Sequence, residues 1–200
     1  MRVLIADDDP VIALALTERV RSLGHEPIGP VANGAEAVSE ATATRPDLYL
    51  FDVEMPELDG LEAAARLTAE GLRRPVVVVT GLDDPALVDR SIANGVGAYL
   101  TKPVTTRQLD AALRLAAARY EELQALEAEV GSARQALEDR KLVERAKGIL
   151  TKALQLPEPD AFRRLQQAAR ERNLRLVEVA RQIVEQQSLL EGAPEARTDT

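Results

Sequence analysis

The chain has 200 residues, of which 46% are hydrophobic, a formal net charge of −8 and no cysteine. The hydrophobic content is sufficient for a buried core and excludes wholesale disorder, and the lack of cysteine excludes a disulfide framework and thiolate metal sites. No apolar run approaches the roughly 18 residues of a membrane span, and a strand begins almost at residue 1, without a charged and apolar leader. We therefore expect a cytoplasmic protein of one or two domains with no membrane partner.

Predicted strands and helices alternate through the first half of the chain. Short apolar runs predict strands over residues 2–6, 26–31, 47–51, 75–79 and 98–100. Amphipathic stretches predict helices from Pro10 to about residue 23, over 35–43, 61–69 and 86–93, and after Val104. This alternation predicts an α/β fold with a doubly wound, parallel, five-stranded sheet.

The strand at residues 47–51 ends in a carboxylate, Asp52. Its apolar residues indicate a strand that is buried on both faces, and Pro56, Asp59 and Gly60 then indicate a loop. In an open parallel sheet, the carboxyl ends of the strands face the ligand crevice. We therefore expect Asp52 to lie at the floor of a binding site.

Polar residues also follow three other predicted strands: Asp7 and Asp8 the first, Thr80 the fourth and Lys102 the fifth. Parallel strands end at one edge, so these side chains should converge around Asp52. Clustered carboxylates repel one another unless a cation joins them, and oxygen ligands favour Mg²⁺. With Lys102 and Thr80 stabilising phosphoryl oxygens, Asp52 could act as a nucleophile. Taken singly, the Asp pair could be a helix cap and the Lys-Pro and Thr80 positions ordinary turns.

Residues 1–118 resemble the receiver domain of two-component response regulators. The motifs that carry the resemblance are Val3-Leu4-Ile5-Ala6-Asp7-Asp8-Asp9, Leu50-Phe51-Asp52-Val53-Glu54-Met55-Pro56 with Asp59-Gly60, Val78-Val79-Thr80-Gly81, and Gly97-Ala98-Tyr99-Leu100-Thr101-Lys102-Pro103. The resemblance implies a flavodoxin-like strand order and Asp52 as the acceptor of a phosphoryl group from a sensor histidine kinase. It also implies Mg²⁺ held by Asp8, Asp52 and the backbone carbonyl of Glu54, with Asp7 acting through water. Lys102 would contact the phosphoryl group, and Thr80 and Tyr99 would form the switch pair.

The helix after Val104 continues in a heptad pattern. Large or mid-sized apolar residues occupy Leu109, Leu113, Ala116, Tyr120 and Leu123, and then Leu126, Val130, Ala133 and Leu137. Steps of three and four residues are typical of a coiled-coil seam; the short step from Leu123 to Leu126 is a stammer, and Gly131 weakens the helix. We expect residues 119–137 to form a coiled-coil linker, with packing against the chain's own domains as the alternative.

The segment at residues 138–190 has a different pattern and a different charge. Wider apolar stripes, separated by Pro157 and Pro159 and by Asn173, predict a small domain of three helices. Residues 137–190 carry a net charge of +3, whereas the remainder carries −11, so this segment could approach a polyanion. Residues 191–200 are expected to be a loose tail.

This segment resembles the ANTAR family of RNA-binding antiterminators. The residues that carry the resemblance are Ala136-Leu137-Glu138-Asp139-Arg140, Val143-Glu144-Arg145-Ala146-Lys147-Gly148-Ile149-Leu150, Ala161-Phe162-Arg163-Arg164-Leu165 and Val179-Ala180. The two resemblances together imply a phosphorylation-controlled response regulator, not an enzyme, that binds paired hairpins in nascent RNA and prevents termination. The heptad seam that follows the first domain also predicts a homodimer that forms on phosphorylation.

Several basic residues could contact RNA phosphates: Arg140, Lys141, Arg145, Lys147, Lys152, Arg163 and Arg164. The chain lacks Trp and has few other aromatic residues, which argues against a stacking platform for single strands. An ordinary solvated charged surface is the alternative for each basic residue. A DNA-binding or a protein-interaction output also remains open, although no helix-turn-helix pair with a short Gly-bearing turn is evident.

Overall fold

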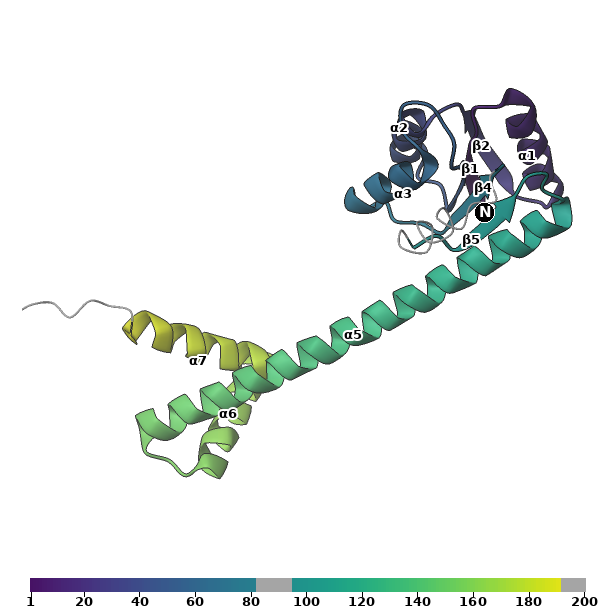
Figure 1. Ribbon diagram of the computed structural model, residues 1–200. Helices are drawn as coiled ribbons and strands as arrows, with labels where there is room; N and C mark the ends of the chain where they lie inside the picture. Colours follow the sequence, from purple (N-terminus) through teal and green to yellow (C-terminus); the bar gives the residue numbers. More distant parts are fainter. Residues whose placement is uncertain (82–94, 192–200) are drawn as a thin grey trace, which may run out of the picture. The chain divides into compact units, whose positions relative to one another are not determined.

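The computed structural model describes residues 1–81 and 95–191 (Figure 1). The predicted helix over residues 86–93 and residues 192–200 of the predicted tail lie outside these ranges. Contacts divide the chain into two compact units, Met1–Ala125 and Leu126–Thr200. Among the described residues, no helix combines the length and apolar character needed to cross a membrane.

The first unit is built on a five-stranded sheet in the order β2-β1-β3-β4-β5, with every pair parallel. The strands are β1 (Arg2–Ala6), β2 (Glu26–Val31), β3 (Leu48–Asp52), β4 (Val76–Thr80) and β5 (Ala98–Thr101). The strand order changes direction at β1, so that β1 and β3 lie side by side at the centre. This arrangement confirms the predicted flavodoxin-like fold and puts the ends of these two strands beside each other.

Helices cover both faces of this sheet. The helices α2 (Gly34–Thr44) and α3 (Gly60–Ala69) lie on one face, and α1 (Pro10–Ser22) lies on the other (Figure 1). Each face has its own apolar core: Tyr49 and Phe51 of β3 point toward α2 and α3, whereas Leu48 and Leu50 point toward α1. Alternate residues of a strand point to opposite faces, so β3 is buried along its whole length.

The helix α5 (Thr106–Leu154) begins as part of the first unit. Leu109, Leu113 and Ala116 are fully buried in the core that also contains α1. Beyond them, the Tyr120 hydroxyl donates a hydrogen bond of 2.8 Å to the carbonyl of Arg73. The first heptad positions therefore pack against the chain's own sheet, and they precede the linker predicted over residues 119–137.

From Leu123 onward the heptad positions are exposed. The exposed fractions are 37% for Leu123, 50% for Val130 and 54% for Leu137. Core packing and coiled-coil pairing share the same helical period, so the sequence pattern continued across the change from one role to the other.

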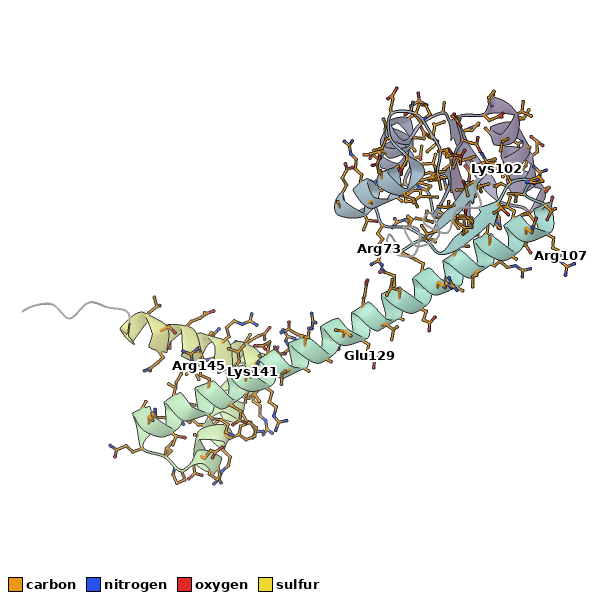
Figure 2. All side chains as sticks on the ribbon, in the orientation of Figure 1. Arg73, Lys102, Arg107, Glu129, Lys141 and Arg145 are labelled. Atoms are coloured by element: carbon orange, nitrogen blue, oxygen red, sulfur yellow. The ribbon has the colours of Figure 1, made fainter. Side chains whose placement is uncertain are left out.

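The second unit contains three helices, as predicted. The last turns of α5 pack with α6 (Glu158–Arg172) and α7 (Leu176–Glu191), and Lys141 and Arg145 lie on this part of α5 (Figure 2). Its core includes Ala146, Leu165, Ala169, Val179, Ala180 and Val184. The predicted stop at Asn173 is the left-handed cap of α6, with φ of 52°.

Candidate functional site

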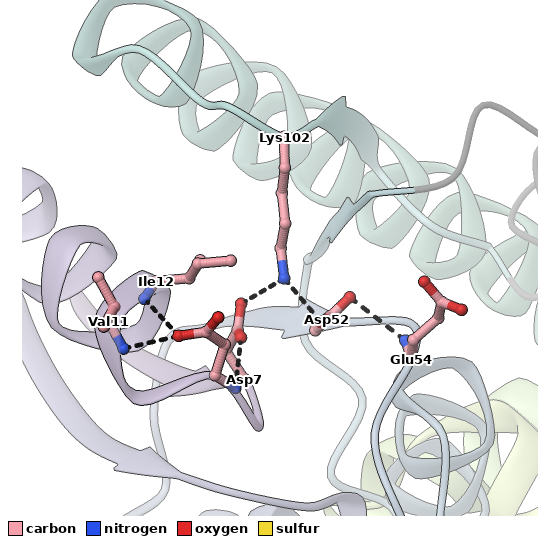
Figure 3. A network of polar contacts seen from close by, with 7 residues as sticks. Asp7, Val11, Ile12, Asp52, Glu54 and Lys102 are labelled. Carbon is pink, nitrogen blue, oxygen red and sulfur yellow. Dashed lines mark hydrogen bonds and ion pairs between the residues drawn. The ribbon is translucent and has the colours of Figure 1, made fainter.

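Three consecutive aspartates follow β1, and they have different roles. Asp9 caps α1, because its side chain accepts hydrogen bonds from the backbone N–H groups of Val11 at 2.8 Å and Ile12 at 3.3 Å (Figure 3). The cap that could have accounted for the Asp pair is therefore supplied by the third aspartate. Asp7 and Asp8 are left at the strand end, with Asp7 buried and Asp8 exposed.

Asp52 is the last residue of β3, one residue later than the predicted strand end. Its side chain is 5% exposed. One carboxylate oxygen, Oδ1, accepts a hydrogen bond of 3.2 Å from the backbone N–H of Glu54, and the other, Oδ2, accepts one of 2.7 Å from the Lys102 ammonium. Both oxygens are thus oriented by neighbours that come from the sequence motifs.

Gly60 allows the backbone around Asp52 to pack closely. A Cβ at this position would lie 1.9 Å from the Asp52 carbonyl oxygen, a separation that no side chain could tolerate. Gly60 is the first residue of α3, and the preceding Asp59 caps this helix in a capping box with Glu62. The Asp-Gly pair that predicted a loop therefore starts a helix directly against the site.

Lys102 joins the two buried aspartates. Its Nζ lies 2.8 Å from Asp7 Oδ2 and 2.7 Å from Asp52 Oδ2 (Figure 3). Burial raises the pKa of both Asp7 and Asp52, and the nearby ammonium offsets only part of this effect. Burial also disfavours the ammonium, but its bonds to Asp52 and Asp7 prevail and raise the pKa of Lys102. One cation thus faces more buried negative charge than it neutralises.

The acidic cluster fits a hard cation. Carboxylate oxygens of Asp7, Asp8 and Asp52 lie within 4.8 Å of one another. Asp7 Oδ2 is buried without a hydrogen bond, because its contact with Lys102 has the distance of an ion pair but not hydrogen-bond geometry. Since Lys102 is shared between Asp7 and Asp52, a second positive charge would further offset the cost of burying these carboxylates, whose oxygens are the ligands that a hard cation prefers.

Thr80 and Tyr99 lie on the two neighbouring strands. Thr80 ends β4, is fully buried, and its carbonyl accepts a hydrogen bond of 2.8 Å from the Lys102 N–H. Tyr99 lies on β5 opposite Val78 and packs, half-buried, against the core under α2 and α3. The structure therefore brings Asp7, Asp8, Asp52, Thr80 and Lys102 to one edge, while the switching role of Thr80 and Tyr99 stays a prediction.

The basic residues of the second unit fall into two groups. Lys141 pairs with Glu138 at 2.7 Å, and Arg163 pairs with Asp160. Among the predicted phosphate contacts, the exposed side chains for which the described residues provide no ion pair are Arg140, Arg145, Lys152 and Arg164. The positive charges of these four side chains are not neutralised by a carboxylate, so they are available to bind a phosphate.

Lys147 connects α5 to α6. Its Nζ lies 2.8 Å from Glu144, 2.7 Å from Glu158 and 5.7 Å from the centre of the Phe162 ring. Its side chain is 13% exposed, and the hydrogen bonds to Glu144 and Glu158 raise the pKa of the ammonium. These contacts indicate a packing role for Lys147, although sequence reasoning grouped it with the RNA contacts.

A hollow of about 520 Å³ lies between α5 and α7. Arg145, Gly148, Ile149, Lys152, Ala153 and Gln187 line it. Sequence reasoning did not identify Gln187, because a single polar residue on an amphipathic helix gives no signal of its own. The glycine inside a helix was the available signal for this surface.

Comparisons with known proteins identify a protein family for each of the two units. The family described as response regulator receiver domain matches residues 3–114, and the ANTAR domain matches residues 132–184. The chain belongs to the response regulators. It is 42% identical over 184 residues to the "Transcriptional regulatory protein PdtaR" of Mycobacterium tuberculosis, an alignment that covers 92% of this chain and 89% of that protein.

Solved structures support the fold of the first unit. The receiver domain of a modulated diguanylate cyclase from Desulfovibrio desulfuricans is 35% identical, with a TM-score of 0.56, and the match covers 62% of this chain and 97% of that one. The receiver domain of the putative response regulator NarL from Mycobacterium tuberculosis is 29% identical, with a TM-score of 0.54, over 57% of this chain and 94% of that one. With its receiver and ANTAR domains, the chain is a signalling regulator that acts as an RNA-binding antiterminator.

Proposed function

We propose that Asp52 accepts a phosphoryl group from a sensor histidine kinase and that this event controls RNA binding by the ANTAR domain. The observation that carries the proposal is the excess of buried negative charge around Lys102, at the carboxyl ends of β1 and β3. A purely structural ion pair would balance its charges. The excess carboxylate charge can hold a divalent cation, and that cation together with Lys102 would stabilise the negative oxygens of a phosphoryl group on Asp52.

Each residue has a separate task in the transfer. An Asp52 oxygen forms the new bond to phosphorus as the bond from phosphorus to the kinase histidine breaks. Lys102, already 2.7 Å from Asp52 Oδ2, holds the acceptor and faces the negative oxygens of the arriving group. Thr80 then donates a hydrogen bond to the phosphoryl group, and Tyr99 occupies the space that it leaves.

The metal is proposed to be Mg²⁺, held by Asp8, Asp52 and the Glu54 backbone carbonyl, with Asp7 acting through water. When bound, Mg²⁺ supplies positive charge to the phosphoryl oxygens. The backbone of Glu54 lies beside Asp52, since its N–H donates a hydrogen bond to Asp52 Oδ1.

The output is proposed to depend on pairing of two chains through residues 119–137. A change at the β5 and α5 face would reach this segment directly, because α5 is continuous from Thr106 to Leu154. Two ANTAR domains brought together would bind two RNA hairpins with an affinity raised by effective concentration. Of the six predicted phosphate contacts, we keep Arg140, Arg145, Lys152 and Arg164 as the strongest candidates, because Lys147 and Arg163 already pair with carboxylates.

Labelling with a small phosphodonor tests the site. We expect the wild-type protein to take up one base-labile phosphoryl group in the presence of Mg²⁺. Asp8→Ala should abolish this Mg²⁺-dependent labelling. Retention of the wild-type rate and of Mg²⁺ affinity by Asp8→Ala, measured by calorimetry, would remove Asp8 from the metal site.

A further inference from the structure

We propose that ion pairs between Glu129 of one copy and the partner's Arg134 make two copies of α5 pair in parallel and in register. The inference rests on the proposed pairing of two chains, and it adds the orientation, the register and the residues that select the partner. The pairing surface is an exposed apolar stripe of α5, made of Leu126, Val130, Ala133 and Leu137.

The spacing of the exposed stripe assigns a heptad position to each residue around it. Steps of four, three and four residues put Leu126 and Ala133 at d positions, and Val130 and Leu137 at a positions. In parallel coiled coils, a β-branched residue at a with leucine at d favours two strands, which fits a second copy of this chain. The next d position is Arg140, so the apolar seam ends after Leu137.

Two opposite charges flank the exposed stripe, Glu129 at a g position and Arg134 at the following e position. Glu129 lies midway along α5, and both side chains are exposed (Figure 2). Neither has an ion pair among the residues that the structure describes, and Glu138, one turn after Arg134, already pairs with Lys141 at 2.7 Å. Residues five positions apart do not face each other on one helix, but in a parallel coiled coil a g residue faces the partner's next e residue. The two charges are therefore complementary between copies and not within one.

A third charge, Glu127 at an e position, distinguishes the two possible orientations. In an antiparallel pair e positions face each other, so Arg134 would meet the partner's Glu127 instead of Glu129. Glu127 already has an interaction within its own chain, whereas Glu129 has no ion pair among the described residues. The parallel orientation also brings both ANTAR domains to the same end of the coil, as binding to two hairpins of one RNA requires.

Charge reversal in the phosphorylated full-length protein tests the ion pairs. Glu129→Arg and Arg134→Glu should each raise the dissociation constant of the dimer at least roughly fivefold, because two symmetry-related attractions become repulsions. The double variant Glu129→Arg/Arg134→Glu has the wild-type net charge, and its dissociation constant should return to within about twofold of wild type. Sedimentation at low salt measures these constants, and added salt should reduce the differences between them.

A mixture of the two single variants gives a second readout. In a parallel heterodimer of Glu129→Arg with Arg134→Glu, both ion pairs are attractive again, whereas each homodimer contains two repulsive pairs. We expect native mass spectrometry of the phosphorylated mixture to show more heterodimer than either homodimer.

Two further variants test the orientation. Glu127→Arg/Arg134→Glu is the matched control, because it has the wild-type net charge but should stay as weak a dimer as Arg134→Glu alone. The chain has no cysteine, so Ala133→Cys introduces a single thiol at a d position of the seam. In a parallel, in-register pair the two thiols face each other, and a mild oxidant should link them. In an antiparallel pair position 133 faces the partner's Val130, so only a mixture with Val130→Cys would be linked efficiently.

The outcomes separate this inference from the proposed function. Phosphorylated wild-type protein that stays monomeric at every concentration would overturn the proposed pairing, and the ion pairs with it. A wild-type dimer that both single reversals leave intact would overturn the ion pairs alone. A dimer restored by Glu127→Arg/Arg134→Glu but not by Glu129→Arg/Arg134→Glu would overturn the parallel orientation, while pairing through α5 would stand.

Discussion

Lys102 in the first unit and Lys147 in the second have nearly the same local geometry. Each ammonium lies within 2.8 Å of two carboxylates, and the side chains are 16% and 13% exposed. The carboxylates differ: the side chains of Asp7 and Asp52 are 0% and 5% exposed, whereas those of Glu144 and Glu158 are 56% and 68% exposed. Water therefore solvates the acids around Lys147 but not those around Lys102.

This difference separates the proposed phosphorylation site from a packing contact. Burial raises the pKa of Asp7 and Asp52, whereas the bonds to Lys147 lower the pKa of Glu158. The first cluster is strained by its charge and gains stability from another cation, whereas the second is already balanced. In this protein, the excess of buried acids over bases is what distinguishes the cluster around Lys102 from the one around Lys147.

The largest expected effect is loss of phosphorylation. Asp52→Asn should abolish labelling by a small phosphodonor, because the amide is not a nucleophile for phosphorus. Intact-mass measurement before and after base treatment checks this directly. A base-labile phosphoryl group added at the wild-type rate to Asp52→Asn would assign the acceptor to another residue.

The close approach at Gly60 should also have a large effect. Gly60→Ala places a methyl group 1.9 Å from the Asp52 carbonyl, so β3 and α3 must separate. We expect a loss of about 1–3 kcal/mol in the free energy of unfolding, typical of overpacking, together with slower labelling of Asp52. Chemical denaturation with Gly148→Ala as the control measures it, since that glycine has open space around it. Equal stability of the two variants would contradict the proposed constraint.

Removal of one buried charge should stabilise the metal-free protein. The folded pKa of Asp52 is raised, so its contribution to stability is full below the unfolded pKa and is lost as pH rises through the folded pKa. In a chelator at neutral pH, Asp52→Asn should therefore be more stable than wild type, by roughly 0.5–3 kcal/mol.

Mg²⁺ should reduce or reverse the difference in the free energy of unfolding between Asp52→Asn and the wild-type protein. At a concentration of 100 times its dissociation constant, Mg²⁺ stabilises the wild-type protein by about 2.7 kcal/mol, and the variant that has lost a ligand gains less. Denaturation curves with and without Mg²⁺ measure both effects. If Asp52→Asn were less stable than the wild-type protein in chelator, Lys102 alone would already neutralise the buried negative charge of the site.

The smallest expected effect concerns Lys147. Lys147→Met removes the ammonium, and with it the contact with the Phe162 ring and the pairs with the solvated Glu144 and Glu158. We expect a small decrease in the melting temperature of the second unit and an unchanged salt slope of RNA binding. A slope lowered as much as in Arg145→Ala would return Lys147 to the RNA contacts.

The sequence predicted the convergence of polar residues at the strand ends better than the rest of the molecule. Each apolar strand stops where a polar residue begins, and parallel topology then brings Asp7, Asp52, Thr80 and Lys102 together. The pairing of Lys147 with Glu158 was not predictable, because it depends on how the chain turns after Leu154. The sequence could not show that Asp9 is the helix cap, because Asp7 and Asp8 directly before it could have served equally well.

The helix α5 shows a different limit of sequence reasoning. Leu109 and Leu123 follow one heptad pattern, yet the first is fully buried against the sheet and the second is 37% exposed. A stripe at this spacing fits a domain core and a pairing seam equally well. Only the position of the sheet determines where one role ends.

The central claim is that phosphorylation at Asp52 promotes pairing through residues 119–137 and thereby RNA binding. A shift of a few kcal/mol between unpaired and paired states is sufficient. Leu123 and Val130 are exposed positions of this segment, so Leu123→Lys and Val130→Lys should block pairing while leaving the phosphorylation of Asp52 intact.

Sedimentation of phosphorylated and unphosphorylated protein, run beside titrations with two-hairpin RNA, tests the claim most directly. We predict that phosphorylation raises the dimer fraction and the RNA affinity together, and that Leu123→Lys or Val130→Lys abolishes both increases. Tight RNA binding by phosphorylated protein that remains monomeric, both free and on RNA, would contradict the account.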